Sequence, residues 1–485
     1  MTESFDLVPV LPELLVVLAA MALLMLGVFR KSDSTAPATS LAVAALVAAM
    51  LLVWAVGGGD RQAVLGGLFV LDPFAVFTKL LLLAASAVTT IMSLSYLQKE
   101  RLGRFEYPVL VLLATTGMMM MVSANDFLAL YLGLELQSLS LYVLAAYHRD
   151  TARATEAGLK YYVLGSLASG MLLYGMSLVY GFSGTTSFDG LARVFGEHGG
   201  HPHMGLIAGL VFVLAGLAFK ISAAPFHMWT PDVYEGAPTP VTSFFAVAPK
   251  IAAMALLVRV MMGPFGDMAD QWRQVVTFIA LLSMFIGSFA AIAQSNIKRL
   301  MAYSSIGHVG FMLVGVAAGS VDGAQGVLVY LAIYLTMNLG VFAVILSMRQ
   351  KGRLLESIGD LAGLAKTNPG MACAMMVLMF SMAGIPPLAG FWGKLYVFKA
   401  AVDAGLYTLA VVGVLASVVS GYYYLRIIKI MYFDEAADGF DRAGGRALGV
   451  VMAVASVVNL VFIAVPGPLL TGAKAAAAVL FPAAG

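Results

Sequence analysis

Five charged residues lie inside segments that are otherwise apolar and long enough to cross a membrane: Glu135, Lys160, Lys220, Lys250 and Lys394. One such charge near the middle of a bilayer helix costs roughly 2.5–3.5 kcal/mol on insertion scales, and several together cost about 10–15 kcal/mol before any pairing. A plain membrane anchor gains nothing from this cost. The pattern therefore predicts that charge, or a proton, moves along these residues.

Lys220 and Lys250 each lie close to a proline. Pro225 follows Lys220 by five residues, and Pro249 directly precedes Lys250. A proline frees a backbone carbonyl and makes room for water. An amine removed from water holds its proton less tightly, so a buried lysine can release and regain a proton near neutral pH. We interpret both lysines as proton-exchanging groups.

Each of these assignments has a structural alternative. Glu135 is the expected counter-ion of Lys220, but the two residues suit a static ion pair that locks two helices equally well. A side chain that reaches the membrane interface is the alternative for Lys250, and its long apolar flanks argue against it. The same alternative weighs more for Lys160, which lies nearer a segment end.

The second half of the chain offers two further candidates. Lys394 lies just beyond a proline- and glycine-rich interruption at 386–390, and His308 has about the place in its segment that Glu135 has in the first half. An imidazole exchanges protons at moderate pH. Because a single histidine in a helix is more often a hydrogen-bonded core residue, His308 is the weaker candidate.

The composition defines the class of protein. The chain has 485 residues, of which 61% are hydrophobic and only 11% charged, whereas a soluble domain has about a quarter charged. A net charge of +2 gives no reason to expect a nucleic-acid partner. The single cysteine, Cys373, excludes a disulfide framework and a cysteine-ligated iron–sulfur cluster. We expect an all-α polytopic membrane protein without a metal or cofactor site of its own.

Apolar runs of about 20 residues predict about fourteen transmembrane helices, counting one broken pair as a single crossing. The acidic N-terminus, 1–6, leads into the first of them, which we expect to be a membrane helix rather than a cleaved signal peptide. The expected spans are 10–29, 40–56, 69–96, 107–122, 127–147, 158–181, 204–221, 242–262, 275–293, 300–318, 327–348, the pair 371–384 and 391–402, 406–430, and 447–470.

Basic residues alternate between the loops on the two sides. With the N-terminus outside, the basic loops 30–31, 99–104, 148–153, 298–299, 349–366 and 426–446 all face the cytoplasm, as the positive-inside rule requires. An even number of spans returns the C-terminus to the outer face. We therefore expect a multi-pass protein of a bacterial inner membrane, with both termini on the periplasmic side.

A repeat divides the chain. An N-terminal three-helix segment, 1–106, precedes two five-helix units at 107–262 and 275–430, and a C-terminal helix and tail occupy 447–485. The fourth helix of each unit is broken by proline and glycine, and an odd number of helices requires the second unit to be inverted. Inverted repeats with matching broken helices indicate a transport site near the middle of the membrane.

Two motifs carry a resemblance to a known family. The run at 227–240 reads His-Met-Trp-Thr-Pro-Asp-Val-Tyr-Glu-Gly-Ala-Pro-Thr-Pro, between Lys220 and Lys250, and 296–308 reads Asn-Ile-Lys-Arg-Leu-Met-Ala-Tyr-Ser-Ser-Ile-Gly-His. Together they resemble the antiporter-like subunits of respiratory complex I, the proton-translocating NADH–quinone oxidoreductase. The resemblance covers nearly the whole chain. Two features distinguish the chain from two paralogues. One paralogue has a glutamate at the position of Lys394, and the other continues into a long helix after the last span, where this chain has only a short stretch.

The resemblance implies roles for these residues. Glu135 and Lys220 would form the ion pair of the first half-channel, with Lys250 as the central relay. Lys394 would be the terminal proton carrier toward the outer face. Lys160 matches a family lysine, and the histidine that opens the first motif, His227, would be a further relay; both have less weight.

The resemblance also implies what the chain works with. It would be one subunit of a multi-subunit translocase that couples NADH oxidation and quinone (ubiquinone) reduction to proton translocation in a respiratory electron-transport chain. NADH, FMN, the iron–sulfur clusters and the quinone would be bound by other subunits. Its partners would be neighbouring antiporter-like and small membrane subunits of the membrane arm, within the lipid bilayer.

Two other functions fit the same helices. A secondary cation/proton antiporter of the same superfamily shares the motifs, and nothing in the helices excludes sodium. A structural scaffold that spaces true pumps would require the buried charges to be inert ion pairs. Copurification with a large NADH-oxidising complex would distinguish a subunit of that complex from a separate antiporter. Variants that assemble but fail to pump would exclude the structural scaffold.

Overall fold

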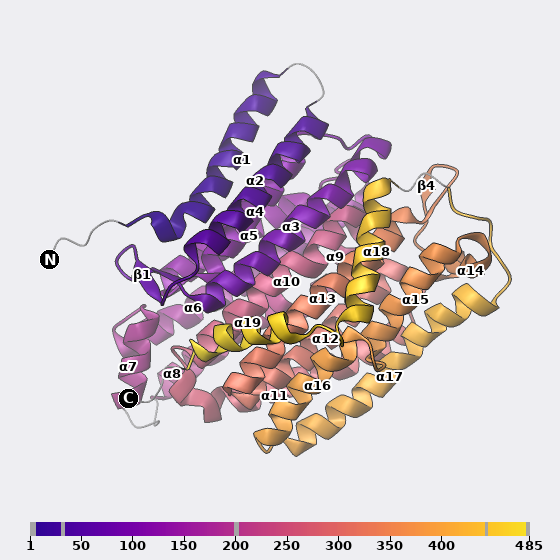
Figure 1. The fold of residues 1–485 in the computed structure, drawn as a ribbon. Helices are drawn as coiled ribbons and strands as arrows, with labels where there is room; N and C mark the ends of the chain where they lie inside the picture. Colours follow the sequence, from indigo (N-terminus) through magenta and orange to yellow (C-terminus); the bar gives the residue numbers. More distant parts are fainter. Residues whose placement is uncertain (1–5, 31–33, 198–202, 442–444, 482–485) are drawn as a thin grey trace.

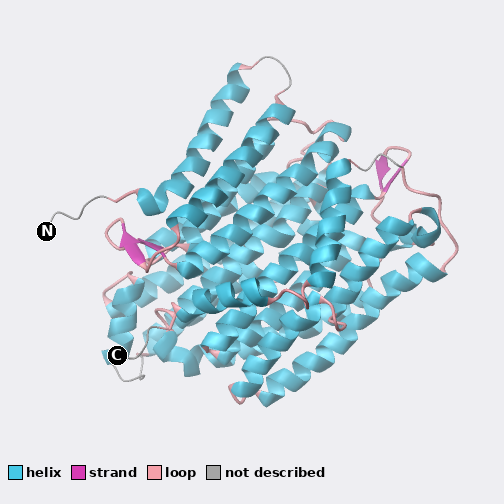
Figure 2. Cartoon of the chain, viewed as in Figure 1, coloured by secondary structure: helices cyan, strands magenta, loops and turns pink. Residues whose placement is uncertain are grey.

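The computed structural model describes residues 6–30, 34–197, 203–441 and 445–481, so most of the acidic N-terminal stretch lies outside the described residues. Within these ranges eleven helices are long and apolar enough to cross a membrane, and three shorter apolar helices accompany them. The predicted all-α membrane fold is confirmed. Figure 2 shows helices almost throughout, with two short strand pairs among the described residues.

The N-terminal segment forms one flank of the bundle, drawn in indigo and purple in Figure 1. A short hairpin of strands, paired antiparallel, separates its second and third helices. The expected third span, starting at 69, was wrong at its beginning: 69–71 is a strand, and Asp72 caps the helix by accepting the backbone N–H of Ala75 at 2.7 Å. The elements are α1 (Leu11–Phe29), α2 (Thr35–Val56), β1 (Gln62–Val64), β2 (Phe69–Leu71) and α3 (Pro73–Lys99).

The two five-helix units have the same order of main helices, including a broken fourth helix, and differ in the short elements between the third and fourth. In the first unit the break separates α8 from α9, and in the second it separates α15 from α16. The first unit comprises α4 (Glu106–Val122), α5 (Phe127–Ala145), α6 (Ala152–Ser183), the short α7 (Phe188–Glu197), α8 (Met204–Ile221), α9 (Trp229–Gly236) and α10 (Thr239–Met262). The second comprises α11 (Ala269–Ile292), α12 (Ile297–Ala318), α13 (Val321–Ser347), β3 (Arg349–Gln350), β4 (Arg353–Leu354), α14 (Leu364–Thr367), α15 (Pro369–Ala383), α16 (Ala389–Asp403) and α17 (Tyr407–Phe433).

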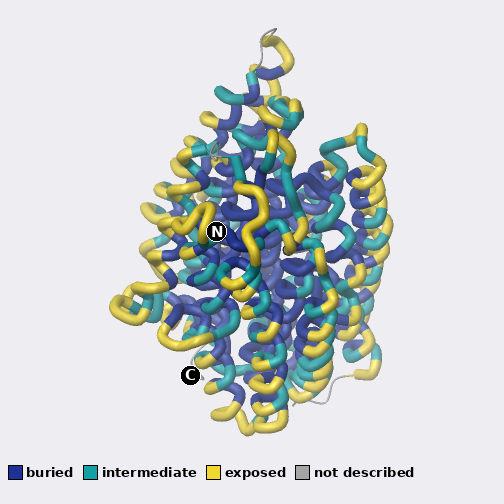
Figure 3. Tube along the Cα trace, turned by 90° about the vertical axis from the view of Figure 1, so that its right-hand side faces the viewer, coloured by how far each residue is buried: buried dark blue, intermediate teal, exposed yellow. Residues whose placement is uncertain are grey.

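Three helices, α10, α12 and α13, form the centre of the bundle. In the most apolar stretch of α10 every residue is buried, and in those of α12 and α13 94% of the residues are buried. In the peripheral α2 only 28% are buried. Figure 3 shows the same gradient from a dark-blue interior to a yellow surface. Lys250 on α10 and His308 on α12 are therefore buried in the interior of the bundle.

The C-terminal part differs from the expectation. The predicted last span, 447–470, was too long, because α18 (Arg446–Val461) ends before Pro466 and a separate helix, α19 (Gly467–Ala478), follows. In Figure 1, α19 crosses in front of the bundle, and it packs against α3 and α13. A hydrogen bond of 3.3 Å from the Gln325 side chain to the Leu470 carbonyl fixes it there. Proline and glycine at the start of α19 explain why the helix does not continue.

Candidate functional site

Lys220 lies in the last turn of α8, at the first helix break. The helix ends because Ser222 adopts a left-handed conformation (φ 64°) and Pro225 follows. The Lys220 ammonium is buried and donates a hydrogen bond to the Ser138 hydroxyl of α5 at 2.7 Å. The helix break therefore places an amine against a hydroxyl inside the bundle.

The expected direct ion pair between Glu135 and Lys220 is not formed. Glu135 lies on α5 one turn before Ser138, is half-buried, and its Oε1 has no hydrogen-bond partner among the described residues. The two charges are close enough to interact electrostatically. The Ser138 hydroxyl is the hydrogen-bond partner of the ammonium, and the carboxylate acts on Lys220 from a distance rather than through contact.

Lys250, in the middle of α10, reaches the same break from the other side. Its Nζ donates to the Ser222 hydroxyl at 3.0 Å and lies 3.5 Å from the Ile221 carbonyl. It also lies 5.7 Å from the centre of the Tyr234 ring. The last carbonyls of a helix carry partial negative charge, so the end of α8 is a favourable place for a cation. Ser222 combines the left-handed turn with a hydroxyl that glycine would lack.

Lys394 stands at the second break in a related arrangement. Its Nζ donates to the Met382 and Ala383 carbonyls, at 3.1 and 3.0 Å, and to the Ser417 hydroxyl at 2.8 Å. The carbonyls are the last of α15, which ends at Gly384 with φ +85°. A Cβ on Gly384 would stand 3.1 Å from the ammonium, so glycine both permits the turn and leaves space for the lysine.

His308 of α12 is held by two tyrosines. Its Nδ1 lies 2.8 Å from the Tyr330 hydroxyl of α13, and its Nε2 lies 3.0 Å from the Tyr424 hydroxyl of α17. One turn earlier on α12, the Ser305 hydroxyl is bonded to Tyr334 at 2.7 Å. The tyrosines were not singled out from the sequence, although Tyr330 and Tyr334 stand one helical turn apart in an apolar run. His308 is thus part of a hydroxyl network at the centre of the second unit.

The two weaker candidates lie away from this buried row. His227 is half-buried in the unwound stretch between α8 and α9, and its Nδ1 has no hydrogen-bond partner within the part of the chain that the structure describes. Lys160 has 41% of its side chain exposed and pairs with Glu156 and Asp232, each at 2.7 Å. The structure therefore places Lys160 in a peripheral cluster of ion pairs.

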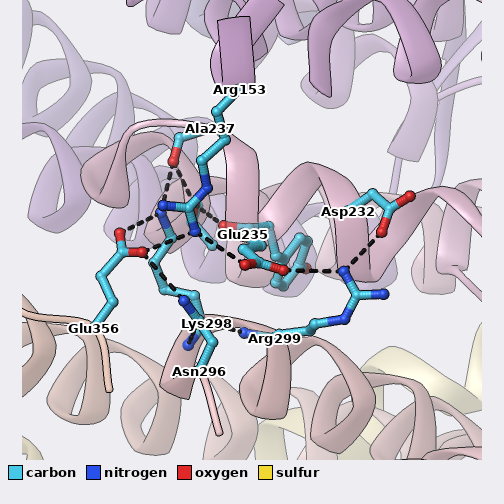
Figure 4. Close-up of polar contacts among 10 residues, drawn as sticks. Arg153, Asp232, Glu235, Ala237, Asn296, Lys298, Arg299 and Glu356 are labelled. Carbon is cyan, nitrogen blue, oxygen red and sulfur yellow. Dashed lines mark hydrogen bonds and ion pairs between the residues drawn. The ribbon is translucent and has the colours of Figure 1, made fainter. Parts of the chain in front are cut away.

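That cluster joins the two units. Asp232 also pairs with Arg299 of α12 at 2.7 Å, and Arg299 pairs with Glu235 at 3.0 Å. Figure 4 shows these α9 carboxylates facing the start of α12. We call the set the inter-unit ion cluster; its members are Arg153, Lys160, Asp232, Glu235, Lys298, Arg299 and Glu356.

Glu356, in the loop after β4, completes the cluster. It accepts bonds from Lys298 and Arg153, both at 2.9 Å, and from the Asn296 amide at 3.2 Å. Its burial alone would raise the pKa of the Glu356 carboxyl, but the charges of Lys298 and Arg153 hold that pKa below the usual range. The carboxylate therefore stays ionised in the assembled cluster.

Replacement of Glu356 by glutamine tests the strength of this cluster. We expect Glu356→Gln to lower the free energy of unfolding by about 1–3 kcal/mol, because a charged hydrogen-bond acceptor for the buried Lys298 and the exposed Arg153 is lost. A lowered pKa means that the contribution of Glu356 is fully present above its ordinary pKa and disappears as the pH falls through the lowered value. Thermal unfolding of the wild type and of Glu356→Gln should be measured from neutral pH to about pH 3. The difference between their unfolding temperatures should narrow as the pH falls.

The exposed Glu435 supplies the control for this measurement. Glu435→Gln should leave the unfolding temperature unchanged across the same pH range. A Glu356→Gln protein as stable as the control at neutral pH would show that the cluster does not hold the units together.

Two buried ion pairs of the N-terminal segment were missed. Lys79 of α3 pairs with Glu13 of α1 at 2.6 Å, and Arg259 of α10 forms two bonds with Asp72, at 2.8 and 2.9 Å. The signal available was Glu13, an isolated carboxylate within the first apolar run.

Comparison with known proteins agrees with this architecture. Residues 124–420 match the family described as NADH:quinone oxidoreductase/Mrp antiporter, TM. The chain therefore belongs to this family of antiporter-like membrane subunits, as its motifs predicted. The particular member that it resembles is subunit N of NADH-quinone oxidoreductase. It is 70% identical to that of Paramagnetospirillum magneticum, over all of both chains, and 61% identical to that of Rhodospirillum rubrum, over 99% of this chain and 98% of the relative.

Solved structures give the same result. A chain of respiratory complex I from Thermus thermophilus with bound aureothin superposes with a TM-score of 0.82 at 33% identity, covering 96% of this chain and 99% of that one. A chain of the Mrp complex from Dietzia sp. shares the fold, with a TM-score of 0.85 at 24% identity and 97% coverage of both chains. The full-length relatives favour the NADH–quinone oxidoreductase interpretation over a separate antiporter.

Proposed function

We propose that the chain is the N-type membrane subunit of a bacterial proton-translocating NADH–quinone oxidoreductase and that protons cross it along Lys220, Lys250, His308 and Lys394. One observation carries the path: these four groups are buried at the bundle interior, and their hydrogen-bond partners are hydroxyls and backbone carbonyls. A hydroxyl accepts from an ammonium and donates to an amine. Each site can therefore hold its group in either protonation state.

The breaks bring neighbouring members of the row together. Lys250 contacts Ser222 and the Ile221 carbonyl, the two residues that directly follow Lys220. Beyond Lys250 stands Tyr234, which is close enough to Tyr334 of the His308 hydroxyl network to interact with it electrostatically. His308 and Lys394 are close enough to interact electrostatically. Protons would pass between these groups through hydroxyls and water.

Electrostatic coupling between the sites would drive the transfer. Each charge moved outward works against about 2.3 kcal/mol per 100 mV of membrane potential. Glu135, which lacks a hydrogen bond at Oε1, is free to approach or leave Lys220 and so to change its proton affinity. Successive changes of this kind along the row would move a proton stepwise.

The same proposal covers the setting of the subunit. Both termini would face the periplasm across the inner membrane, as the distribution of basic loops indicates. NADH, FMN, the iron–sulfur clusters and the quinone would be bound by other subunits. Neighbouring antiporter-like and small membrane subunits would flank this one in the membrane arm.

Lys220→Ala in the intact complex tests the path. We expect NADH oxidation and proton pumping to fall together by roughly tenfold, because a positioned acid–base group is lost while Glu135 remains to support slow transfer. Inverted membrane vesicles allow both rates to be measured on one preparation, with assembly checked by native gel. Wild-type rates for both activities in an assembled Lys220→Ala complex would show that the row is structural.

A further inference from the structure

The Glu13–Lys79 pair is as deeply buried as the proposed row, yet it lies outside it. The side chains are 4% and 0% exposed, and the pair joins α1 to α3 at 2.6 Å. Neither group has a hydrogen-bond partner beyond the other among the described residues. The Lys79 ammonium otherwise faces the Phe69 ring, 4.7 Å from its centre.

The neighbouring Asp72–Arg259 pair shows what a fully bonded pair looks like. Both Asp72 oxygens bind the guanidinium, one of them also accepts the Ala75 N–H, and Arg259 Nε donates to the Val122 carbonyl. A buried ion pair is stable when such extra bonds satisfy its remaining donors and lone pairs. Since Glu13 and Lys79 lack these bonds, the charged form of their pair is much less favoured over the neutral form.

A file of hydroxyls leads away from this pair. Ser86, Thr90 and Ser93 follow Lys79 on the same face of α3, at intervals that match the helical period, and all three are buried. From Lys79 to Ser93 is about 21 Å of helix at 1.5 Å per residue, and the three hydroxyls lie along the second half of this stretch. The Thr115 hydroxyl of α4 joins the file by donating to Ser86 at 3.0 Å. Hydroxyls both donate and accept, so they can pass a proton.

We propose that Glu13 and Lys79 form a further proton-transfer site, served by the hydroxyl file of α3 and lying on the N-terminal flank of the path. Lys79 gives a proton to Glu13: an N–H bond breaks, an O–H bond forms, and both groups become neutral. The Glu13 acid passes that proton on to a hydroxyl or water, and the Lys79 amine takes up the next proton, which restores the pair.

The position links this site to the central row. Helix α3 packs against α10, and Arg259, beside the pair, lies nine residues after Lys250 on α10. A change of charge at Glu13 and Lys79 is therefore transmitted through low-dielectric protein to the central lysine. This inference rests on the proposed proton path and adds a second entrance or exit to it.

Lys79→Arg in the intact complex is the decisive variant. Arginine keeps the positive charge and the ion pair, but it does not release its proton. We expect the complex to assemble normally. The number of protons pumped for each NADH oxidised should fall, and the rate of NADH oxidation should fall by roughly tenfold or more. Lys99→Arg, an exposed position at the end of the same helix, is the matched control and should behave as wild type.

A second variant guards against a folding defect. Glu13→Leu/Lys79→Met replaces the pair by apolar side chains of similar size, which commonly preserves stability, and it should also assemble without normal pumping. Wild-type pumping by Lys79→Arg or by the double variant overturns the proposal. Loss of assembly in both variants overturns it too, because the pair is then structural.

Lys220→Ala on matched preparations separates this inference from the proposed function. A defective Lys220→Ala with a normal Lys79→Arg contradicts only the second site. A normal Lys220→Ala contradicts the row itself.

Discussion

Lys394→Ala should abolish proton pumping while leaving the complex assembled. Lys394 is 5% exposed, and its ammonium is held by the last carbonyls of α15 and by Ser417, none of which can take up and hold a proton in its place. At Lys220, by contrast, Glu135 remains nearby. We therefore expect a loss of roughly a hundredfold in pumping for Lys394→Ala, in the range of a removed general acid–base. Dye quenching in vesicles, with NADH oxidation on the same sample, measures it.

Helix α16 supplies a matched control for this variant. Lys399 stands five residues further on, has 65% of its side chain exposed and pairs with Asp403 at 2.6 Å. Lys399→Ala should pump normally, because a surface pair contributes little. Equal pumping by the two variants would remove Lys394 from the path and leave it as a cap for the end of α15.

Arg259→Met should have the largest effect on stability. It would leave the Asp72 carboxylate buried without its bidentate partner, and would also remove the bond to the Val122 carbonyl. Breaking a buried pair from one side costs about 3–5 kcal/mol. We expect a lower unfolding temperature of the purified subunit and reduced incorporation into the complex, both measured at neutral pH.

The double variant Asp72→Asn/Arg259→Met supplies the comparison. It removes the unpaired charge while the introduced amide oxygen can still accept the Ala75 N–H, so much of the lost stability should return. An Arg259→Met protein as stable as wild type would show that Asp72 is not held by this pair. Additive losses in the double variant would show that the two residues act independently.

Local sequence signals predicted the fold almost completely. The break after Ile221 and the one near Gly384 followed from proline and glycine, whose backbone preferences are independent of tertiary contacts. Hydropathy located the spans because every membrane helix must satisfy its own backbone. The last span was placed wrongly since hydropathy alone does not distinguish α18 from α19, and the turn at Pro466 separates them.

The partners of the charged residues were not predictable in the same way. The sequence pointed to Lys220, Lys250 and Lys394, because an isolated charge in an apolar run is visible without a structure. It paired Lys220 with Glu135, whereas the hydroxyl of Ser138 takes that place. Serines in membrane helices are common, and only the tertiary arrangement that brings Ser138 of α5 to the end of α8 selects one of them.

The inter-unit ion cluster has a consequence for how the protein moves. Many transporters built from inverted repeats work by alternating access, in which one repeat rocks against the other around a fixed site. Such rocking would pull Arg299 away from Asp232 and Glu235, and Arg153 away from Glu356, all in one step. A proton needs only side-chain rotations and short water chains, so the two halves can stay joined throughout the cycle. A subunit that transports without rocking can remain rigidly docked to its neighbours while it turns over.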